Sequence, residues 1–407
     1  MQGVLVEKPY KFVPPITQSW PAKMAVTLGI HKWLLKSQEG VVDCEVRNVD
    51  RLKESVAAGH GVMLTPNHPR TTDPIVMSHL VAAGIPFYAM ASWHLFNQSA
   101  LATFTIRMMG AFSVNREGLD KASVDYAVNV LQNAERPLLI FPEGATSRTN
   151  DQLMALMDGP AFIARTAAKR RSKKDGGKVV VHPVGVRYLF QGDLDKACEG
   201  VLTEIEHKLT WRPSPEKPLV DRIVKIGDAL LRLKELEQGV LPDSSLTLKQ
   251  RQNALVDRLL HPLEEEWLGE HSDSGIVIRI KNLRMKIFPE LSRHTLPEAE
   301  QKRRWRQLED TYLAQQVDCY PEQYLTEHPS VDRILETVEK FEEDLNDRCR
   351  IHGNMKVIID IDEAIEVSGK RDRTAKTDPL MDQIRNRLEI KMAELQSESR
   401  MYVAPSL

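Results

Sequence analysis

Residues 61–74 read Gly-Val-Met-Leu-Thr-Pro-Asn-His-Pro-Arg-Thr-Thr-Asp-Pro, an apolar run followed by a polar turn. The run Gly61–Thr65 is short and apolar enough to predict a buried strand. The prolines that follow bar a helix through the turn, so His68 is expected on a loop. Asp73 followed by Pro74 predicts the start of the next helix. The pattern therefore places a histidine and a carboxylate together on one strand-to-helix turn.

The pair His68 and Asp73 suits general base catalysis. Histidine titrates near neutral pH, and a neighbouring carboxylate fixes its tautomer and raises its basicity. If the protein supplies this base but no nucleophile of its own, the base would activate a hydroxyl group of a substrate. The alternative is that Asp73 only caps the helix and His68 is solvated. His79 and His94 could join the pair at a metal, but the spacing matches no familiar ligand set, so no metal is expected.

The composition is that of a globular protein. The chain has 407 residues, 42% hydrophobic and 28% charged, enough for two domains or for one large and one small domain. The net charge of -2 argues against general nucleic-acid binding. The four cysteines have no metal-ligand spacing, which fits a reducing compartment. Neither a signal peptide nor a transmembrane helix is expected, so the sequence predicts a cytoplasmic location.

Strands and helices are expected to alternate on both sides of the turn. The expected strands are 41–49, 61–65, 86–91, 110–116, 137–141 and 179–186, and the expected helices are 52–58, 75–83, 98–109, 120–133 and one opening at 159. This alternation predicts an α/β fold with a mostly parallel sheet flanked by helices. Sites in such sheets form beyond the carboxyl ends of the strands. Because His68, Arg116 and Glu143 each follow an apolar strand, they are expected to converge there.

Four segments carry a family pattern. Residues 67–73 hold His-x4-Asp, and residues 110–116 hold a glycine, an apolar strand and an arginine six places on. Residues 141–144 read Phe-Pro-Glu-Gly, and residues 181–184 read Val-His-Pro-Val. In this order and approximate spacing they resemble the four blocks of the glycerolipid acyltransferase family, which includes the 1-acylglycerol-3-phosphate acyltransferases. The resemblance covers about residues 41–228.

The resemblance implies the transfer of an acyl chain from a thioester of coenzyme A or acyl carrier protein. The implied acceptor is a hydroxyl of a glycerol phosphate or lysophospholipid. His68 would be the general base and Asp73 would orient it. Arg116 would bind the acceptor phosphate, and Glu143 and Gly144 would shape the acceptor side of the site. No metal or redox cofactor is implied.

Two departures from the family pattern remove positive charge from the expected acceptor region. Thr146 stands where the family usually has an arginine, with Arg148 as a candidate substitute. Asp158 stands near the place of a family lysine. These departures keep open an acyltransferase whose acceptor is not a glycerolipid. The alternative hypothesis from another functional class is a noncatalytic lipid-binding protein with the same fold.

The segments flanking this pattern suggest contact with a membrane. Within the N-terminal segment 1–40, residues 24–35 predict an amphipathic helix that lies either in a membrane interface or on the protein's own core. The basic run at 169–178 is either a solvated loop or a segment that attracts anionic lipid. Such an attraction is worth about 1 kcal/mol per basic residue. Together they predict a peripheral protein on the inner face of the membrane.

The acyltransferase-like domain is expected over 41–230, with Val224–Asp228 as a late strand similar to one in the family. Residues 231–407 are expected to be mainly helical, with no chemistry that the sequence identifies. This region could cover the core, bind a partner or form a lid. Its expected elements are helices at 248–268, which Pro262 should kink or split, 298–316, 331–349 and 379–399, and a strand at 357–361.

Overall fold

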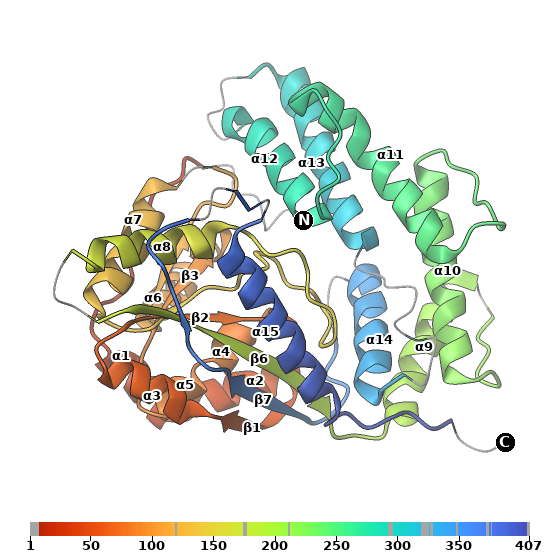
Figure 1. The fold of residues 1–407 in the computed structure, drawn as a ribbon. Coiled ribbons are helices and arrows are strands. Elements are labelled where there is room, and N and C mark those ends of the chain that lie inside the picture. The colour runs from red at the N-terminus through yellow and green to blue at the C-terminus, as the bar shows by residue number, and fades with distance from the viewer. Residues whose placement is uncertain are drawn as a thin grey trace.

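The computed structural model places one mixed sheet at the centre of the molecule and a separate layer of helices beside it (Figure 1). The residues described are 8–118, 120–173, 177–210, 212–291, 296–318, 325, 329–346, 349–371, 374–375 and 377–404.

The sheet has the strand order β1-β7-β6-β2-β5-β3-β4, with β8 beside β6. Neighbouring strands run parallel, except that β6 is antiparallel to both β7 and β8. The mostly parallel sheet predicted from the sequence is therefore confirmed. The strand bounds are β1 Val41–Arg47, β2 Gly61–Pro66, β3 Tyr88–Ser92, β4 Ala111–Val114, β5 Leu138–Leu139, β6 Val179–Phe190, β7 Met355–Ile361 and β8 Ile365–Glu366.

Helices cover both faces of the sheet. On β2, Val62 and Leu64 pack into one core and Met63 into the other, which explains why this strand is apolar throughout. Asp120 caps α7 by accepting a hydrogen bond from the Ser123 N–H. The helices of the first half are α1 Trp20–Thr27, α2 Ile30–Glu39, α3 Val49–Ala57, α4 Asp73–Val76, α5 His79–Ala82, η1 Trp93–Asn97, α6 Ala100–Met108, α7 Lys121–Asn133 and α8 Gly159–Arg171.

Two predicted helices are broken in the structure. The helix predicted over 24–35 is divided between α1 and α2, because Gly29 between them has φ 73°, a left-handed conformation that favours glycine. The helix predicted over 75–83 is divided into the single turns α4 and α5.

The remaining helices confirm a mainly helical C-terminal region. The strand predicted at Val224–Asp228 is wrong, because these residues lie inside α10, where Ile223, Ile226 and Leu230 are buried at helical spacing. Pro262 does not split its helix, which continues through it. The bounds are α9 Leu194–Thr210, α10 Leu219–Glu237, α11 Leu248–Leu268, α12 Ile276–Leu291, α13 Glu298–Asp318, α14 Val331–Asn346 and α15 Pro379–Gln396.

The C-terminal region also completes the sheet. β7 lies between β1 and β6, and α15 packs on β6. Helices α11, α12 and α13 instead share a core of their own, seen at the top right of Figure 1. The boundary predicted at residue 230 falls inside α10, and the sheet takes strands from both sides of it.

Candidate active site

His68 and Asp73 meet on the turn that follows β2. The Nδ1 atom of His68 lies 2.7 Å from Oδ2 of Asp73, and the Asp73 side chain is fully buried. The imidazole stacks on the ring of Phe141 with 3.9 Å between centroids. In the part of the chain that the structure describes, Nε2 has no hydrogen-bond partner. The ring is thus fixed through one nitrogen and leaves the other for a substrate.

Two further donors hold the Asp73 carboxylate. The Tyr188 hydroxyl on β6 donates to Oδ1 at 2.6 Å, and the backbone N–H of Arg70 donates to Oδ2 at 2.9 Å. The residue at the N-cap of α4 is Thr72, and no side chain caps that helix. Asp73 therefore contacts the histidine instead of the first amides of α4.

Glu143, after β5, holds the backbone of the same turn. Its Oε1 accepts a hydrogen bond from the His68 N–H at 2.7 Å, and its Oε2 accepts one from the Met154 N–H at 2.9 Å. Burial raises the pKa of Glu143 to about 7, and the two N–H donors oppose this shift. The Ser147 N–H completes the clamp by donating to the His68 carbonyl at 2.8 Å. Glu143 thus acts on the position of the His68 turn.

Arg116 reaches the same loop from the end of β4. Its guanidinium donates to the carbonyl of Gly144 at 2.7 Å, while its buried Nε has no partner in the described residues. Gly144 has φ 68°, and a Cβ there would lie 3.2 Å from Cγ of Met157. This position therefore favours glycine for both its backbone and its space. The structure thus brings Arg116, Glu143 and Gly144 together beside His68.

Arg148 lies on the continuation of this loop, but its charge is paired. The residue has φ 64°, and its guanidinium forms an ion pair with Glu343 of α14. Thr146 carries no charge. The positive charge of Arg148, which the sequence suggested as a substitute for the missing arginine, is therefore partly neutralised by Glu343.

A row of acidic residues on α14 contacts the loops of the site, and the sequence analysis missed it. Glu339 accepts a hydrogen bond from the Arg70 guanidinium at 2.6 Å, and Glu39 at the end of α2 accepts another at 2.7 Å. Glu336 accepts one from the Asn150 N–H at 3.1 Å. Asp332, Glu336, Glu339 and Glu343 are spaced four, three and four residues apart, which puts them on one face of a helix. That spacing was the signal available in the sequence.

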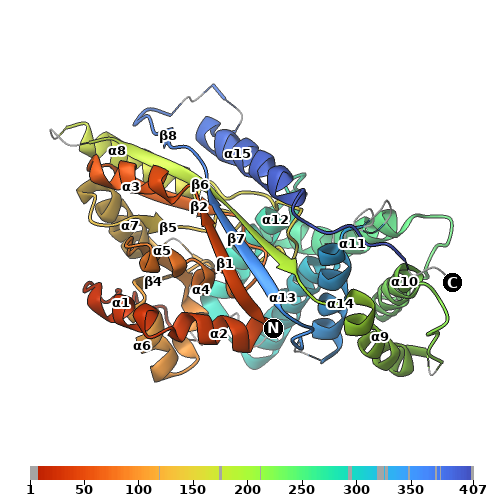
Figure 2. The same cartoon turned by 90° about the horizontal axis from the view of Figure 1, so that it is seen from below.

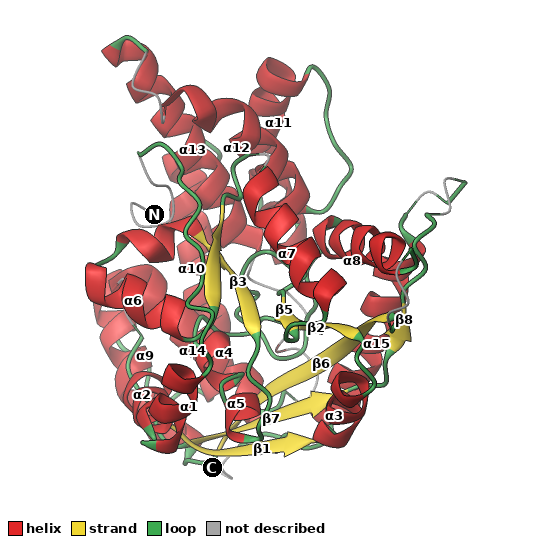
Figure 3. Cartoon of the chain, turned by 90° about the vertical axis from the view of Figure 1, so that its left-hand side faces the viewer, coloured by secondary structure: helices red, strands yellow, loops and turns green. Residues whose placement is uncertain are grey.

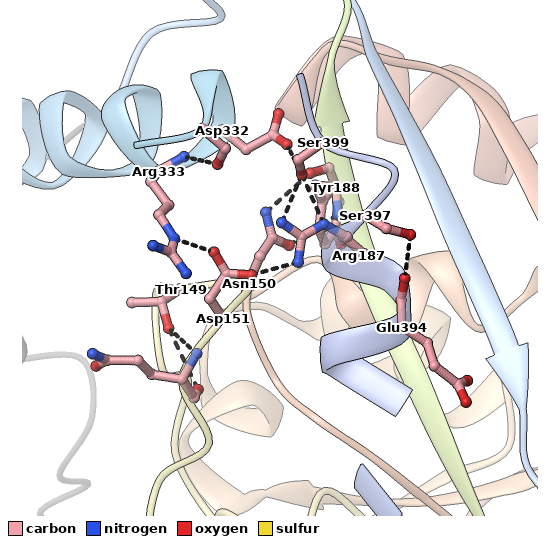
Figure 4. A network of polar contacts seen from close by, with 12 residues as sticks. Thr149, Asn150, Asp151, Arg187, Tyr188, Asp332, Arg333, Glu394, Ser397 and Ser399 are labelled. Carbon is pink, nitrogen blue, oxygen red and sulfur yellow. Dashed lines mark hydrogen bonds and ion pairs between the residues drawn. The ribbon is translucent and has the colours of Figure 1, made fainter. Parts of the chain in front are cut away.

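A buried polar network extends this contact to the C-terminal segment (Figure 4). Arg187 on β6 donates to Oγ of Ser399 through Nε at 3.0 Å, and it pairs with Asp151. Arg333 of α14 pairs with the same Asp151, and Ser399 donates to Asp332. The network joins β6, the loop after Glu143, α14 and the segment after α15. The strand that carries Tyr188 is thereby fixed to the helix that holds Arg70.

Within the described residues, one cluster has the ligand types of a metal site. Glu342, Cys349 and His352 place ligand atoms within 4.8 Å of one another. The Glu342 carboxylate already pairs with Arg350 and with Nε2 of His352. The exposed Cys349 thiol lies 3.9 Å from the same Nε2 of His352. The cluster is thus a set of mutual side-chain contacts.

Comparison with known proteins finds a similarity to acyltransferases in residues 44–187. The sequence model of the acyltransferase family matches residues 44–187. A curated relative, the 1-acyl-sn-glycerol-3-phosphate acyltransferase of Streptococcus pneumoniae (strain ATCC BAA-255 / R6), is 32% identical over 108 residues, which are 26% of this chain. The chain spans 38% of the length of that relative. The matched residues carry the His68 turn and the groups that hold it, so residues 44–187 are similar to the acyltransferase family in the part of the chain that forms this site.

Proposed function

We propose that the protein transfers an acyl chain from a thioester of coenzyme A or acyl carrier protein to a hydroxyl of a glycerol phosphate or lysophospholipid. The observation that carries the proposal is the 2.7 Å contact between His68 Nδ1 and the buried Asp73, with Nε2 left without a partner in the described residues. The match of residues 44–187 to the acyltransferase family supports the same reaction.

His68 would act as base and then as acid. Asp73 holds the Nδ1 proton, so the lone pair of Nε2 faces the substrate. Nε2 takes the proton of the acceptor hydroxyl while that oxygen attacks the thioester carbonyl. The tetrahedral intermediate then breaks its C–S bond, and the leaving sulfur takes the proton back from Nε2. An ester and a free thiol result, and no nucleophile from the protein is needed.

The oxyanion formed in this step needs hydrogen-bond donors. The N–H groups of His68 and Arg70 are already bound to the carboxylates of Glu143 and Asp73. The N–H groups of Thr71 and Thr72 have no partner in the described part of the chain. They are therefore the backbone donors of this loop that would bind the oxyanion.

The acceptor is the part of the proposal that a direct assay must decide. Purified protein is given acyl-CoA or acyl carrier protein thioester, and the release of free thiol is followed with a panel of acceptors. The panel contains glycerol 3-phosphate, 1-acylglycerol 3-phosphate, 1-acylglycerol and a lipid amine. We expect the phosphorylated glycerol acceptors to give the highest rates. Turnover with 1-acylglycerol alone would establish a glycerolipid acceptor without phosphate, and turnover with the lipid amine alone would establish a non-glycerolipid acceptor. No turnover with any acceptor would favour a lipid-binding protein.

We also propose that the protein meets the membrane with an apolar edge made by α1, α2 and α6. Figures 2 and 3 show these helices together at one edge of the molecule. The large apolar side chains exposed there, each more than half accessible, are Trp20, Met24, Leu28, Trp33, Leu101 and Phe104. Exposed Lys23, Lys32 and Lys36 accompany them, as expected beside lipid phosphates. Within the described residues, no helix combines the length and apolarity needed to cross a bilayer.

The basic run at 169–178 contributes less charge than its sequence suggests. Arg171 is buried and donates to backbone carbonyls of residues 59, 132 and 177. Lys178 pairs with Glu366. Residues 174–176 lie outside the described part of the chain. The apolar edge is therefore the stronger candidate for contact with lipid.

Co-sedimentation with vesicles tests this contact. We expect Trp33→Ser with Leu101→Ser to reduce binding to vesicles that contain anionic lipid, and added salt to reduce it further. Phe162→Ser is the matched control, because Phe162 is 60% exposed on α8, on the other side of the molecule in Figures 2 and 3. If the control and the double variant lost vesicle binding equally, the apolar edge would not be the part of the protein that contacts the membrane.

A further inference from the structure

The end of α14 and the segment before β7 bring three metal-ligand atoms together. Glu342 and His352 are buried, with 1% and 4% of their side chains exposed, and Cys349 is exposed. Nε2 of His352 lies 2.9 Å from Oε2 of Glu342 and 3.9 Å from Sγ of Cys349, and the three ligand atoms all lie within 4.8 Å of one another. The contacts among these side chains therefore gather one oxygen, one nitrogen and one sulfur at a single place.

The separations are close to those of a tetrahedral zinc site. Zinc bonds of about 2.0–2.3 Å to oxygen, nitrogen and sulfur put neighbouring ligand atoms about 3.4–3.6 Å apart. The distances from Nε2 of His352 to Oε2 and to Sγ differ from these values by about 0.5 Å or less. A set that mixes oxygen, nitrogen and sulfur suits Zn²⁺, whereas Mg²⁺ and Ca²⁺ prefer oxygen ligands.

Arg350 orients the Glu342 carboxylate and leaves it able to bind a cation. The Arg350 guanidinium pairs with Oε1 of Glu342, and the Arg350 N–H donates to Oε2 at 3.0 Å. Burial raises the pKa of Glu342, but the hydrogen bonds from Arg350 oppose it and the net shift is downward, so the carboxylate is charged at neutral pH. Because a carboxylate oxygen has two lone pairs, Oε2 can keep this N–H and also bind an ion. Groups that hold a metal ligand from behind usually serve this purpose.

The charge of a divalent ion would be balanced by its own ligands. Binding would release the proton of the Cys349 thiol and move the proton of His352 from Nε2 to Nδ1. The Glu342 carboxylate and the thiolate then supply two negative charges, and the imidazole binds as a neutral group. Arg350 keeps its ion pairs with Glu342 and Glu204. The occupied site would therefore be neutral without any further partner.

We propose that Glu342, Cys349 and His352 form a zinc site that fixes the end of α14 to the start of β7, with water as the fourth ligand. The site lies outside residues 44–187, and it does not depend on the proposed acyl transfer. A zinc ion held by three protein ligands at this place would contribute to the stability of the folded chain.

The place of the site in the fold says what the ion would stabilise. The segment that carries Cys349 and His352 leads directly into β7, which lies between β1 and β6 in the sheet. Glu339, about one turn before Glu342 on α14, binds the guanidinium of Arg70. An ion at the end of α14 would therefore support both the sheet and the helix that contacts the loop of Arg70.

A titration of the full chain, stripped of metal with a chelator, tests the ligands. Zn²⁺ is added in competition with a chromogenic zinc indicator, and we expect one Zn²⁺ per chain. Cys349→Ser and His352→Gln should each weaken the affinity by more than the roughly 10–100-fold that loss of an outer-shell partner costs. Affinity that is unchanged in both variants would overturn the proposal.

Two matched controls exclude binding at other cysteines and histidines. Cys44→Ser changes a cysteine of β1, and His261→Gln changes a surface histidine of α11 that stacks on His271 with 4.1 Å between ring centroids. Both controls should bind Zn²⁺ as the wild type does. Zinc that is lost in His261→Gln and kept in Cys349→Ser would assign the ion to the stacked histidines and overturn the proposal.

Cobalt gives a direct signature of the sulfur ligand. Co²⁺ is a divalent substitute for Zn²⁺, and a thiolate ligand gives it a charge-transfer absorption band in the near ultraviolet. We expect this band in the wild type and in Cys44→Ser, and we expect it to be absent in Cys349→Ser. Wild-type protein that is saturated with Co²⁺ and lacks the band would contradict the sulfur ligand and with it the proposed site.

The melting temperature tests the structural role without any turnover. We expect Zn²⁺ to raise the melting temperature of the wild type and of His261→Gln, and a chelator to reverse the rise. Cys349→Ser should melt near the metal-free wild type, because the residue is exposed, and it should not respond to Zn²⁺. An equal rise in the wild type and in Cys349→Ser would show that the ion binds elsewhere.

Discussion

The His68 turn and helix α14 serve the same site in different ways. The turn presents reactive groups: the His68 side chain is 15% exposed, and its Nε2 has no partner in the described residues. α14 presents holding groups, since Glu339 binds Arg70 and Glu336 binds the Asn150 N–H. The turn belongs to the family match, whereas α14 lies outside it.

The difference teaches that the site depends on both halves of the chain. Arg70 lies two residues from His68, and its guanidinium is held by Glu39 on α2 and by Glu339 on α14. Its backbone N–H holds Asp73. A change on α14 should therefore reach the turn through stability and geometry, while a change on the turn itself should reach the reaction directly.

Among changes that leave His68 in place, the largest effect on activity should come from Asp73→Asn. An amide cannot accept from all the donors that surround Asp73, and it no longer fixes the tautomer of His68. We expect acyl transfer to fall by about 10²–10⁴-fold, the usual contribution of general base catalysis. Free-thiol release measures the rate, and denaturant unfolding measures the loss of stability. A fully active variant would break the comparison, because the turn would then carry no reactive pair.

The matched pair Glu339→Gln and Glu343→Gln tests the holding role of α14. Removing Glu339 leaves the largely buried Arg70 with one carboxylate, and we expect a loss of about 3 kcal/mol in the free energy of unfolding. Glu343 pairs with Arg148 at a more exposed place, so the same substitution there should cost less than about 1 kcal/mol. Chemical denaturation of both variants decides between them. Equal losses would show that α14 does not hold the turn through Arg70.

A smaller effect is expected from Tyr188→Phe, which removes the hydroxyl that donates to Asp73. We expect about tenfold lower kcat/KM, a stability loss of about 1 kcal/mol and a shift in the pH profile of kcat/KM. Tyr402→Phe is the control, because Tyr402 makes a similar bond to Asp195 away from the turn. If the two variants share one pH profile, Tyr188 is structural and does not position the pair.

The smallest expected effect is on the pH dependence of the free energy of unfolding, which tests the buried position of Glu143 beside the His68 turn. Burial raises the pKa of Glu143 from 4.5 to about 7, so between these values the folded protein holds a proton that the unfolded chain has lost. The stability contributed by this group should therefore fall as pH rises through that window, by at most about 1.4 kcal/mol per pH unit. Glu143→Gln should lack this component. The difference in slope between the two proteins is the quantity to measure, and equal slopes would contradict the burial argument.

Local patterns in the sequence predicted the strands and the residues that follow them. β2, β4 and β5 each end just before a residue of the site, and the apolar runs that form them are continuous in the sequence. The strand at 357–361 was also predicted, but its place between β1 and β6 was not, because strand pairing joins distant residues. The strand predicted at Val224–Asp228 was wrong because Ile226 lies on the buried face of α10 at helical spacing, whereas Val224 is exposed.

Local sequence patterns do not predict the contacts that hold the site together. Arg70 and Glu339 are 269 residues apart in the chain, and no local signal joins them. The acidic spacing on α14 was visible in the sequence, but a charged face on a helix usually faces solvent.

The most direct test of the account is the initial rate of free-thiol release by the His68→Ala variant, with acyl-CoA and 1-acylglycerol 3-phosphate. The substitution removes Nε2 and leaves the bonds of the Arg70 N–H and Tyr188 to Asp73 in place. The melting temperature should therefore stay near that of the wild type, which shows that the protein is folded. The account predicts a rate lower by about 10²–10⁴-fold. Wild-type turnover by the folded variant would contradict it.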